Sequence, residues 1–349
     1  MNKFEIHTGD AFEILKTYPD NYFDCCVTSP PYFGLRDYGM KNQIGLEPSV
    51  EEYINKLILI FQQVKRSLKK EGTCWLNLGD SYNFSGGGHT KNKRGGNAGL
   101  NSNPDNELAK GHKPRYLNNY KPKCLLGIPW KTAISLQNDG WYLRSDIIWN
   151  KPNPMPESVK DRPTRSHEYI FLLTKSKRYY YNQEAIRMPL KISSIKRLTQ
   201  PTFDLQTGGP KDGINPNRSC RIALDNLHKK IYSTRNPQPG IDISGNQSTR
   251  YGIPHYENIG TNIRSVWTIP TQPRKEKHFA TFPDKLPEIC IKAGCPEGGI
   301  VLDPFLGRGT SGVAAIKLNK NFIGIELNPE YAEMARKNIL SISPLFVRG

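Results

Sequence analysis

A nucleoside-binding pattern near the carboxyl end of the chain constrains the fold more than any other feature. It consists of a strand, an acidic residue, a glycine-rich turn, a helix, a second strand and a second acidic residue, found here as 300–302, Asp303, Gly307 with Gly309, 311–318, 322–325 and Glu326. Parallel strands joined by a helix build doubly wound α/β folds, which bind ligands beyond the carboxyl ends of their strands. We therefore expect an open α/β sheet that binds a nucleoside.

The turn itself indicates the kind of cofactor. Gly307 and Gly309 let the backbone approach a ligand, and Glu326 is placed to accept hydrogen bonds from both ribose hydroxyls. The third glycine of dinucleotide-binding turns is absent, and Asp303-Pro304-Phe305 precedes the turn instead. The pattern favours a cofactor without a pyrophosphate over NAD.

A second motif, Ser29-Pro30-Pro31-Tyr32, follows a predicted buried strand over 23–28. The amino nitrogen of a nucleic acid base is a poor nucleophile because its lone pair is delocalised into the ring. The Ser29 hydroxyl and the Pro30 carbonyl can accept hydrogen bonds from that amino group and make its nitrogen more reactive. The paired prolines hold the carbonyl rigidly, and Tyr32 offers a flat face for an extruded base. These four residues are the predicted catalytic residues.

The two motifs are separated by a basic region. Residues 185–275 contain 14 Lys and Arg against 5 Asp and Glu, within a chain of net charge +17. Such a surplus favours nucleic acid as the partner. We predict a catalytic half over 1–185, with a mobile loop over about 83–122, a target-recognition region over 186–274 and a cofactor-binding half over 275–349.

Other classes of protein are disfavoured by what the sequence lacks. The seven cysteines form no CxxC pair and have no histidines at zinc-finger spacing, which argues against a metal site and a disulfide framework. There is no apolar run of about 18 residues and no signal-peptide pattern at the first residues. We expect an intracellular protein without a membrane segment.

Together, the motifs resemble the DNA methyltransferases that methylate base amino groups, in the subgroup with the β order: catalytic motif, recognition region, cofactor motif. The resemblance implies a Rossmann-like, S-adenosylmethionine-dependent fold, with a mixed seven-stranded sheet, helices on both faces and an inserted target-recognition domain. It also implies a cytoplasmic enzyme, prokaryotic or phage-encoded, acting on double-stranded DNA, with a cognate restriction endonuclease as a possible partner. Nothing in the sequence predicts the oligomeric state.

The resemblance also extends the predicted cofactor site. That site comprises Asp10, Ala11, His278, Phe282, Asp303, Pro304, Phe305, Gly307, Gly309, Thr310 and Glu326. Within it, Asp10 is expected to accept from the adenine amino group of the cofactor, and 278–283 to close over its methionine moiety. Segments 77–80 and 149–152 match weaker family motifs near the base pocket. Arg308 stands where the family usually has a small residue.

The target base and the activity leave alternatives open. Serine at the first position of the tetrad favours cytosine N4 within the family, while adenine N6 is the alternative. A methyltransferase of RNA or protein is disfavoured, because those relatives place the cofactor motif first. An inactive DNA-binding module is disfavoured by the intact tetrad and glycine turn.

Overall fold

The computed structural model describes residues 3–35, 37–83, 117–189, 240–241, 247–248, 260–272 and 282–342. The chain divides into two compact units, one of Met1–Asn182 with Arg264–Gly349 and one of Gln183–Ile263. The second unit contains the 3-10 helix η2 (Glu184–Ile186), the strand pair β6 (Met188–Pro189) and β9 (Gly260–Thr261), and the pair β7 (Gly240–Ile241) and β8 (Gln247–Ser248).

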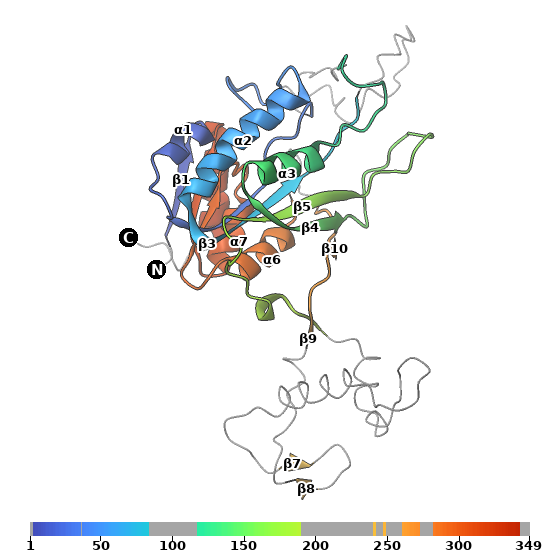
Figure 1. Cartoon of the computed structure of the whole chain (residues 1–349). Coiled ribbons are helices and arrows are strands. Elements are labelled where there is room, and N and C mark those ends of the chain that lie inside the picture. The colour runs from blue at the N-terminus through green and yellow to red at the C-terminus, as the bar shows by residue number, and fades with distance from the viewer. Residues whose placement is uncertain are drawn as a thin grey trace, which may run out of the picture. The chain divides into compact units, whose positions relative to one another are not determined.

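The first unit is built on one mixed sheet (Figure 1). Its strands, in spatial order, are β1 (Phe4–Thr8), β12 (Asn321–Glu326), β11 (Ile300–Asp303), β2 (Phe23–Thr28), β3 (Leu68–Leu78), β5 (His167–Thr174), β4 (Tyr142–Asn150) and β10 (Val266–Thr268). Only β5 runs against its neighbours, since it pairs antiparallel with both β3 and β4, and the other described pairs in this sheet are parallel. The mixed α/β sheet agrees with the prediction.

The predicted number of seven strands was wrong for the described residues, because β10 adds an eighth at the edge. Its three residues pair in parallel with β4, where Trp267 lies opposite Trp149 and is buried. A strand this short has no readable alternation of apolar and polar residues, and it lies within the segment assigned to target recognition.

Two groups of helices cover the sheet (Figure 1). The first comprises α1 (Ala11–Lys16), α2 (Val50–Ser67) and α3 (Ile128–Asn138), and the second α6 (Lys285–Gly294), α7 (Thr310–Lys317) and α8 (Pro329–Ile342). Alternation along β3 shows that the two groups lie on opposite faces. Cys74, Leu76 and Leu78 join the core under α1–α3, whereas Thr73 and Trp75 approach Gly294 of α6.

The order of strands places the site. From β11 the chain passes through α7 to β12 on one side, and from β2 through α2 to β3 on the other. β11 and β2 are neighbours in the sheet. Their carboxyl ends therefore lie at the topological switch point, where doubly wound sheets bind ligands. Asp303 ends β11 and Ser29 follows β2, so the cofactor motif and the tetrad meet there.

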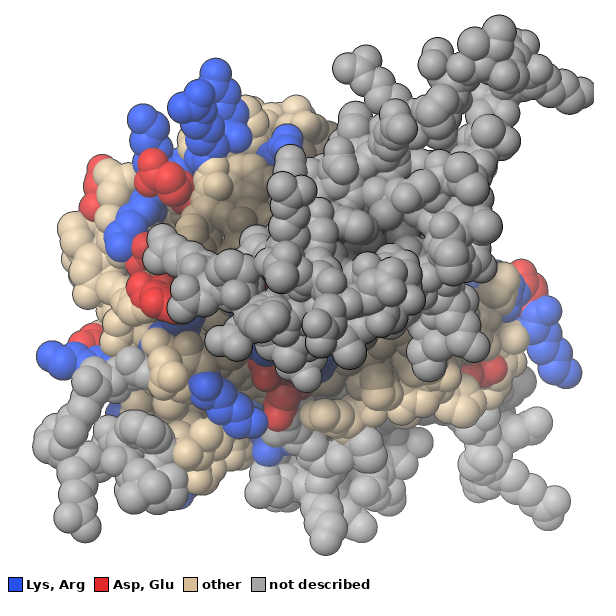
Figure 2. Space-filling view, turned by 90° about the horizontal axis from the view of Figure 1, so that it is seen from below, with Lys and Arg blue, Asp and Glu red and all other residues tan. Residues whose placement is uncertain are grey.

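On the face shown in Figure 2, Lys and Arg side chains of the described residues are interspersed with Asp and Glu. No helix in the described part of the chain is long and apolar enough to cross a membrane.

Most of the predicted mobile loop, 84–116, lies outside the described residues, but Asn83 bonds to the backbone of Leu117 and Tyr120 at the far end of that segment.

Candidate active site

A cavity of about 570 Å³ lies at the carboxyl ends of β1, β2, β3, β11 and β12. It brings together most of the residues expected from the sequence: Asp10, Ala11, Ser29, Pro30, Pro31, Tyr32, Phe282, Pro304, Phe305, Gly307, Thr310 and Glu326. Asp303 and Gly309 do not line it, and His278 lies outside the described residues. Both motifs therefore open into one space large enough for a nucleoside-sized ligand.

Asp303 faces the protein and not the cavity. Its carboxylate accepts from the Thr28 hydroxyl at 2.6 Å, the Ser311 hydroxyl at 2.5 Å and the Phe305 backbone N–H at 3.0 Å. Burial raises the pKa of Asp303 to about 6, although these hydrogen bonds oppose the rise. Asp303 thus shapes the cofactor loop and ties it to the end of β2, and the geometry does not favour direct contact with a ligand.

The two glycines of the loop serve different needs. Gly307 and Gly309 both have left-handed backbone angles, with φ of 54° and 84°. A Cβ on Gly309 would lie 2.9 Å from the Cβ of Ala335 in α8, so this glycine allows the start of α7 to pack closely. Gly307 has open space where a Cβ would stand, and it borders the cavity.

Glu326 holds the loop while facing the cavity. Its Oε2 accepts from the Gly307 N–H at 2.7 Å and its Oε1 from the Asn328 N–H at 2.9 Å. Burial raises the pKa of Glu326, and the two N–H groups lower it. A carboxylate can accept about four hydrogen bonds, so Glu326 retains capacity for two ribose hydroxyls, and the site fits a nucleoside cofactor.

The end of β1 completes the cofactor side. The Gly9 N–H donates to the Glu326 carbonyl at 2.9 Å, in line with the pairing of β1 and β12. Asp10 then begins α1, where its Oδ1 accepts from the Glu13 N–H at 3.1 Å. Because this cap engages Oδ1, Oδ2 of Asp10 can still accept a hydrogen bond beside Glu326.

The tetrad is fixed by a helix behind it. The Tyr53 hydroxyl of α2 donates to the Pro31 carbonyl at 2.9 Å. Within the described part of the chain, no group donates to the Pro30 carbonyl. Pro31 is therefore a structural anchor, while the Pro30 carbonyl stays available beside the Ser29 hydroxyl.

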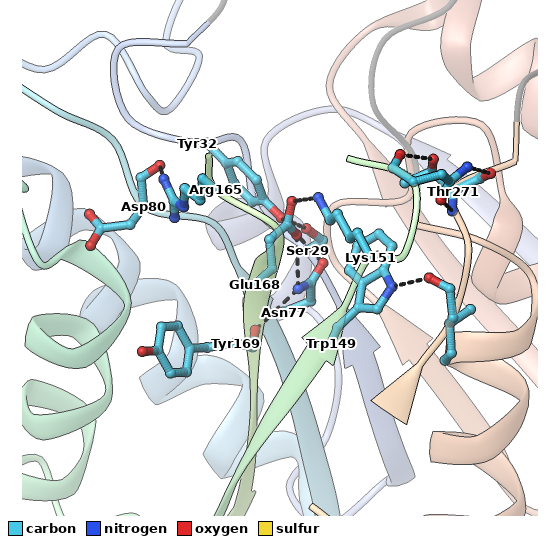
Figure 3. Close-up of polar contacts among 12 residues, drawn as sticks. Ser29, Tyr32, Asn77, Asp80, Trp149, Lys151, Arg165, Glu168, Tyr169 and Thr271 are labelled. Atoms are coloured by element: carbon cyan, nitrogen blue, oxygen red, sulfur yellow. Dashed lines mark hydrogen bonds and ion pairs between the residues drawn. The ribbon is translucent and has the colours of Figure 1, made fainter. Parts of the chain in front are cut away.

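A polar network that contacts Ser29 and Tyr32 was not predicted from the sequence (Figure 3). Glu168 of β5 accepts through Oε2 from the Tyr32 hydroxyl at 2.6 Å and from Asn77 Nδ2 at 3.2 Å, and through Oε1 from Lys151. Ser29 Oγ donates to the Tyr32 hydroxyl at 3.3 Å. Burial, followed by the neighbouring Glu168, raises the pKa of Tyr32 well above its ordinary value, so its hydroxyl stays a neutral donor.

Part of this network carried a signal in the sequence. Asn77 and Lys151 lie in the segments 77–80 and 149–152, which match family motifs, but nothing in the apolar run of β5 marks Glu168. Asp80, in the same motif as Asn77, instead accepts from the Gly127 and Ile128 N–H groups at the start of α3. That aspartate borders the cavity while it caps a helix.

A doubly wound sheet with an acidic, glycine-turned loop and a Ser-Pro-Pro-Tyr tetrad in one cavity is the architecture of an amino-methylating methyltransferase. The profile of a family described as DNA methylase matches residues 23–337. The chain is 42% identical over 340 residues to the Type II methyltransferase M.SmaI of Serratia marcescens, covering 97% of this chain and 92% of that protein. It is 40% identical over 335 residues to M.Cfr9I of Citrobacter freundii, with coverages of 96% and 87%.

Solved structures agree in fold. A putative DNA modification methylase from Thermus thermophilus, complexed with S-adenosyl-L-methionine, matches with a TM-score of 0.55 and 18% identity, covering 99% of this chain and 96% of that one. The PvuII DNA methyltransferase (cytosine-N4-specific) matches with a TM-score of 0.58 and 16% identity, with coverages of 97% and 87%. The chain belongs to the DNA methylase family. It is a DNA amino-methyltransferase.

Proposed function

We propose that this enzyme methylates N4 of cytosine in double-stranded DNA, with Ser29, Pro30 and Tyr32 acting on the base and Glu326 and the 304–310 loop holding the cofactor. The observation that carries the proposal is that the Ser29 and Pro30 acceptors and the Glu326 carboxylate border one cavity. A reacting nitrogen and a methyl donor can therefore be brought together there.

The residues of the chain have distinct tasks in this reaction. S-adenosylmethionine supplies an electrophilic methyl group. Ser29 Oγ and the Pro30 carbonyl accept from the two amino protons, which localises the lone pair on the nitrogen. Tyr32 is held by Glu168 and Asn77, so its ring keeps one orientation for stacking against the base.

Lys151 supports the choice of cytosine. Lys151 lines the cavity, and its ammonium bonds to Glu168 and lies 4.4 Å from the centre of the Trp149 ring. Beside its amino group, cytosine presents two acceptors, the ring nitrogen N3 and the carbonyl oxygen O2, whereas the corresponding edge of adenine presents N1 alone. A fixed cationic donor next to the tetrad therefore suits cytosine better. Adenine N6 remains the second candidate.

The product nucleoside tests this proposal. The enzyme is incubated with duplex DNA and S-adenosylmethionine, the DNA is digested, and methylated nucleosides are separated and weighed by mass spectrometry. N4-methyldeoxycytidine is the expected product. N6-methyldeoxyadenosine as the main product would refute the choice of cytosine and leave the enzyme class intact.

Two variants separate the two halves of the site. Ser29→Ala should lower turnover while leaving the dissociation constant of the cofactor near the wild-type value. Glu326→Ala should weaken cofactor binding by about 10- to 150-fold, since hydrogen bonds to a charged group contribute about 1.5–3 kcal/mol. Calorimetric titration with S-adenosylhomocysteine measures the dissociation constants of both variants. Equal cofactor binding by the two variants would contradict these assignments.

We further propose that the region 186–274 recognises the target sequence, and that an endonuclease of the same specificity is the partner. The region falls between the two motif blocks and is rich in Lys and Arg. Long-read sequencing of DNA from cells that express the chain would define the recognition sequence. Resistance of that DNA to an endonuclease with the same recognition sequence would then support the partnership.

A further inference from the structure

Met155 is an apolar side chain presented to solvent at the edge of the active-site cavity. It is 64% exposed, the highest value among the large apolar side chains of the described residues, and it also lines the cavity that contains Ser29 and Tyr32. Isolated exposed apolar residues are common and need no explanation. Met155 differs from such residues in two ways. It lies at the cavity that a target base would enter, and its loop is held rigidly.

The loop that carries Met155 is held on both sides. Pro152, Pro154 and Pro156 surround the residue and restrict the backbone. Before Met155, Asn153 exchanges two hydrogen bonds with the backbone of Thr271, at 2.9 and 3.1 Å (Figure 3).

After Met155, the loop is held a second time. Arg162 bonds to Glu157 at 2.6 Å, and its guanidinium lies 3.9 Å from the centre of the Tyr82 ring. Met155 is thus exposed although its backbone is anchored, which lowers the entropic cost of using it in a contact.

We propose that Met155 enters the DNA and fills the space that the target base leaves when it moves into the cavity. The inference rests on the proposed function, because it requires a base to leave the duplex. Extrusion breaks stacking on both sides of the base, and proteins offset this cost by inserting apolar side chains, methionine among them, between base steps. An unbranched, polarisable thioether suits such an irregular gap.

Leu35 is the competing candidate, since it is 45% exposed and also lines the cavity. Its N–H donates to the Tyr32 carbonyl at 3.3 Å, and the neighbouring Gly34 N–H donates to the Gly45 carbonyl at 2.8 Å. Leu35 therefore belongs to the turn that closes the tetrad. Met155 lies on a separate loop whose described anchors do not involve the tetrad, which favours it as the residue that stays with the duplex.

The test compares two duplexes that carry the recognition sequence found by sequencing. In one, the target base is paired, and in the other its partner is replaced by an abasic site, so that less work is needed to extrude the target. We expect Met155→Ala to lower turnover by about 10-fold or more on the paired duplex and by less than about 2-fold on the abasic one. Met155→Leu should retain most of the activity on both.

Val159→Ala is the matched control, since Val159 is 39% exposed on the same loop and does not line the cavity. It should leave turnover on both duplexes unchanged. Wild-type turnover of Met155→Ala on the paired duplex, or equal losses on both duplexes, would overturn the inference while leaving the proposed function standing. If Leu35→Ala lost turnover on the paired duplex alone and Met155→Ala lost none, the role would belong to Leu35. Failure of the wild-type enzyme on both duplexes would instead refute the proposed function, and the inference with it.

Discussion

At the scale of single residues, Tyr32 shows how neighbours define a reactive site. Its hydroxyl is bound by Glu168 at 2.6 Å and Asn77 at 3.2 Å, so its ring cannot rotate freely. Burial, followed by the neighbouring Glu168, raises the pKa of Tyr32 well above its ordinary value and keeps the hydroxyl protonated. These properties suit the proposed role of the ring as a flat surface of fixed orientation, and they do not suit a role as an acid or base.

Substitutions of Tyr32 should separate these two properties. Stacking of a base on an aromatic ring contributes about 1–3 kcal/mol, so Tyr32→Ala should reduce single-turnover methyl transfer to duplex DNA by about 5- to 150-fold. Tyr32→Phe retains the ring but loses the anchor, and should fall between the wild type and Tyr32→Ala. Cofactor affinity should be unchanged in both. Wild-type turnover in Tyr32→Ala would show that the stacking role is wrong.

Asp303 predicts a pH dependence of stability. Its pKa is raised by burial from 3.8 to about 6, so the folded protein holds this proton more tightly than the unfolded chain does. The resulting stability is fully present below pH about 4 and is lost as the pH rises to about 6. A shift of about two pKa units corresponds to about 3 kcal/mol.

Asp303→Asn should remove this component, because the amide has no charge to bury and its Oδ1 can still accept from Thr28. Denaturant unfolding at pH 4 and pH 7 measures the effect. For each protein, the free energy of unfolding at pH 4 is subtracted from that at pH 7. We expect this difference to be more negative, or less positive, for the wild type than for the variant. Equal pH dependence in both proteins would contradict the assignment.

At the scale of elements, the carboxyl end of β3 and the tetrad are fitted to each other. A Cβ on Gly79 would lie 2.5 Å from the ring of Tyr32, closer than real contacts allow. Gly79 follows Leu78, the last residue of β3, and borders the cavity. The space that this glycine leaves is therefore occupied by the ring of the tetrad.

Gly79→Ala should displace Tyr32 and lower turnover by about 10-fold or more, by analogy with the sensitivity of catalysis to misplacements of about 1 Å. Cofactor binding should be spared, because Glu326 lies on β12. Turnover and S-adenosylhomocysteine affinity measured on the same preparation test this. If affinity fell together with turnover, a general loss of fold would be the better explanation.

How far the sequence predicts these elements depends on the strength of their patterns. The strand Phe23–Thr28 and the loop from Asp303 agree with expectation, because an apolar run ends abruptly at prolines or glycines there. In contrast, β3 runs from Leu68 to Leu78, and the polar Lys69 and Lys70 near its start do not mark it as a strand. The pairing with β2 shifts its register across these residues, between Phe23 and Cys25 of β2, which no local pattern reveals.

The site was predicted less completely than the fold. The residues of the two motifs gather in one cavity, but Glu168 is a single acidic residue at the start of a mainly apolar strand. Its importance comes from Tyr32, which is 136 residues away in the sequence. Local patterns contain no information about such a partner, and for the same reason they do not reveal that the Asp303 carboxylate bonds to Thr28 and Ser311.

At the scale of the whole molecule, charge is distributed unevenly along the chain. Of the net charge of +17, more than half lies in residues 185–275, and the rest is spread over the remainder. Contacts between cations and DNA phosphates release counterions, so that affinity falls with salt concentration in proportion to their number.

Neutralising three cations in the basic region should therefore make DNA binding weaker and less sensitive to salt. We expect Lys229→Gln, Lys230→Gln and Arg235→Gln, combined, to reduce the slope of log affinity against log salt by up to about three. The control carries Lys70→Gln, Lys177→Gln and Lys317→Gln, all of them exposed and none of them lining the cavity. Equal slopes in both variants, measured by fluorescence anisotropy, would argue against DNA binding through the basic region.

The hydrogen bond between Thr28 and Asp303 joins residues 275 positions apart in the sequence. It is made between adjacent parallel strands, so the catalytic and cofactor motifs are held together by the sheet and not by the segment that connects them. The two halves are in effect complementary fragments of one active centre. A break in the intervening segment would leave every described contact between the motifs in place, which makes this enzyme suitable for conversion into a two-piece switch whose activity depends on reassembly.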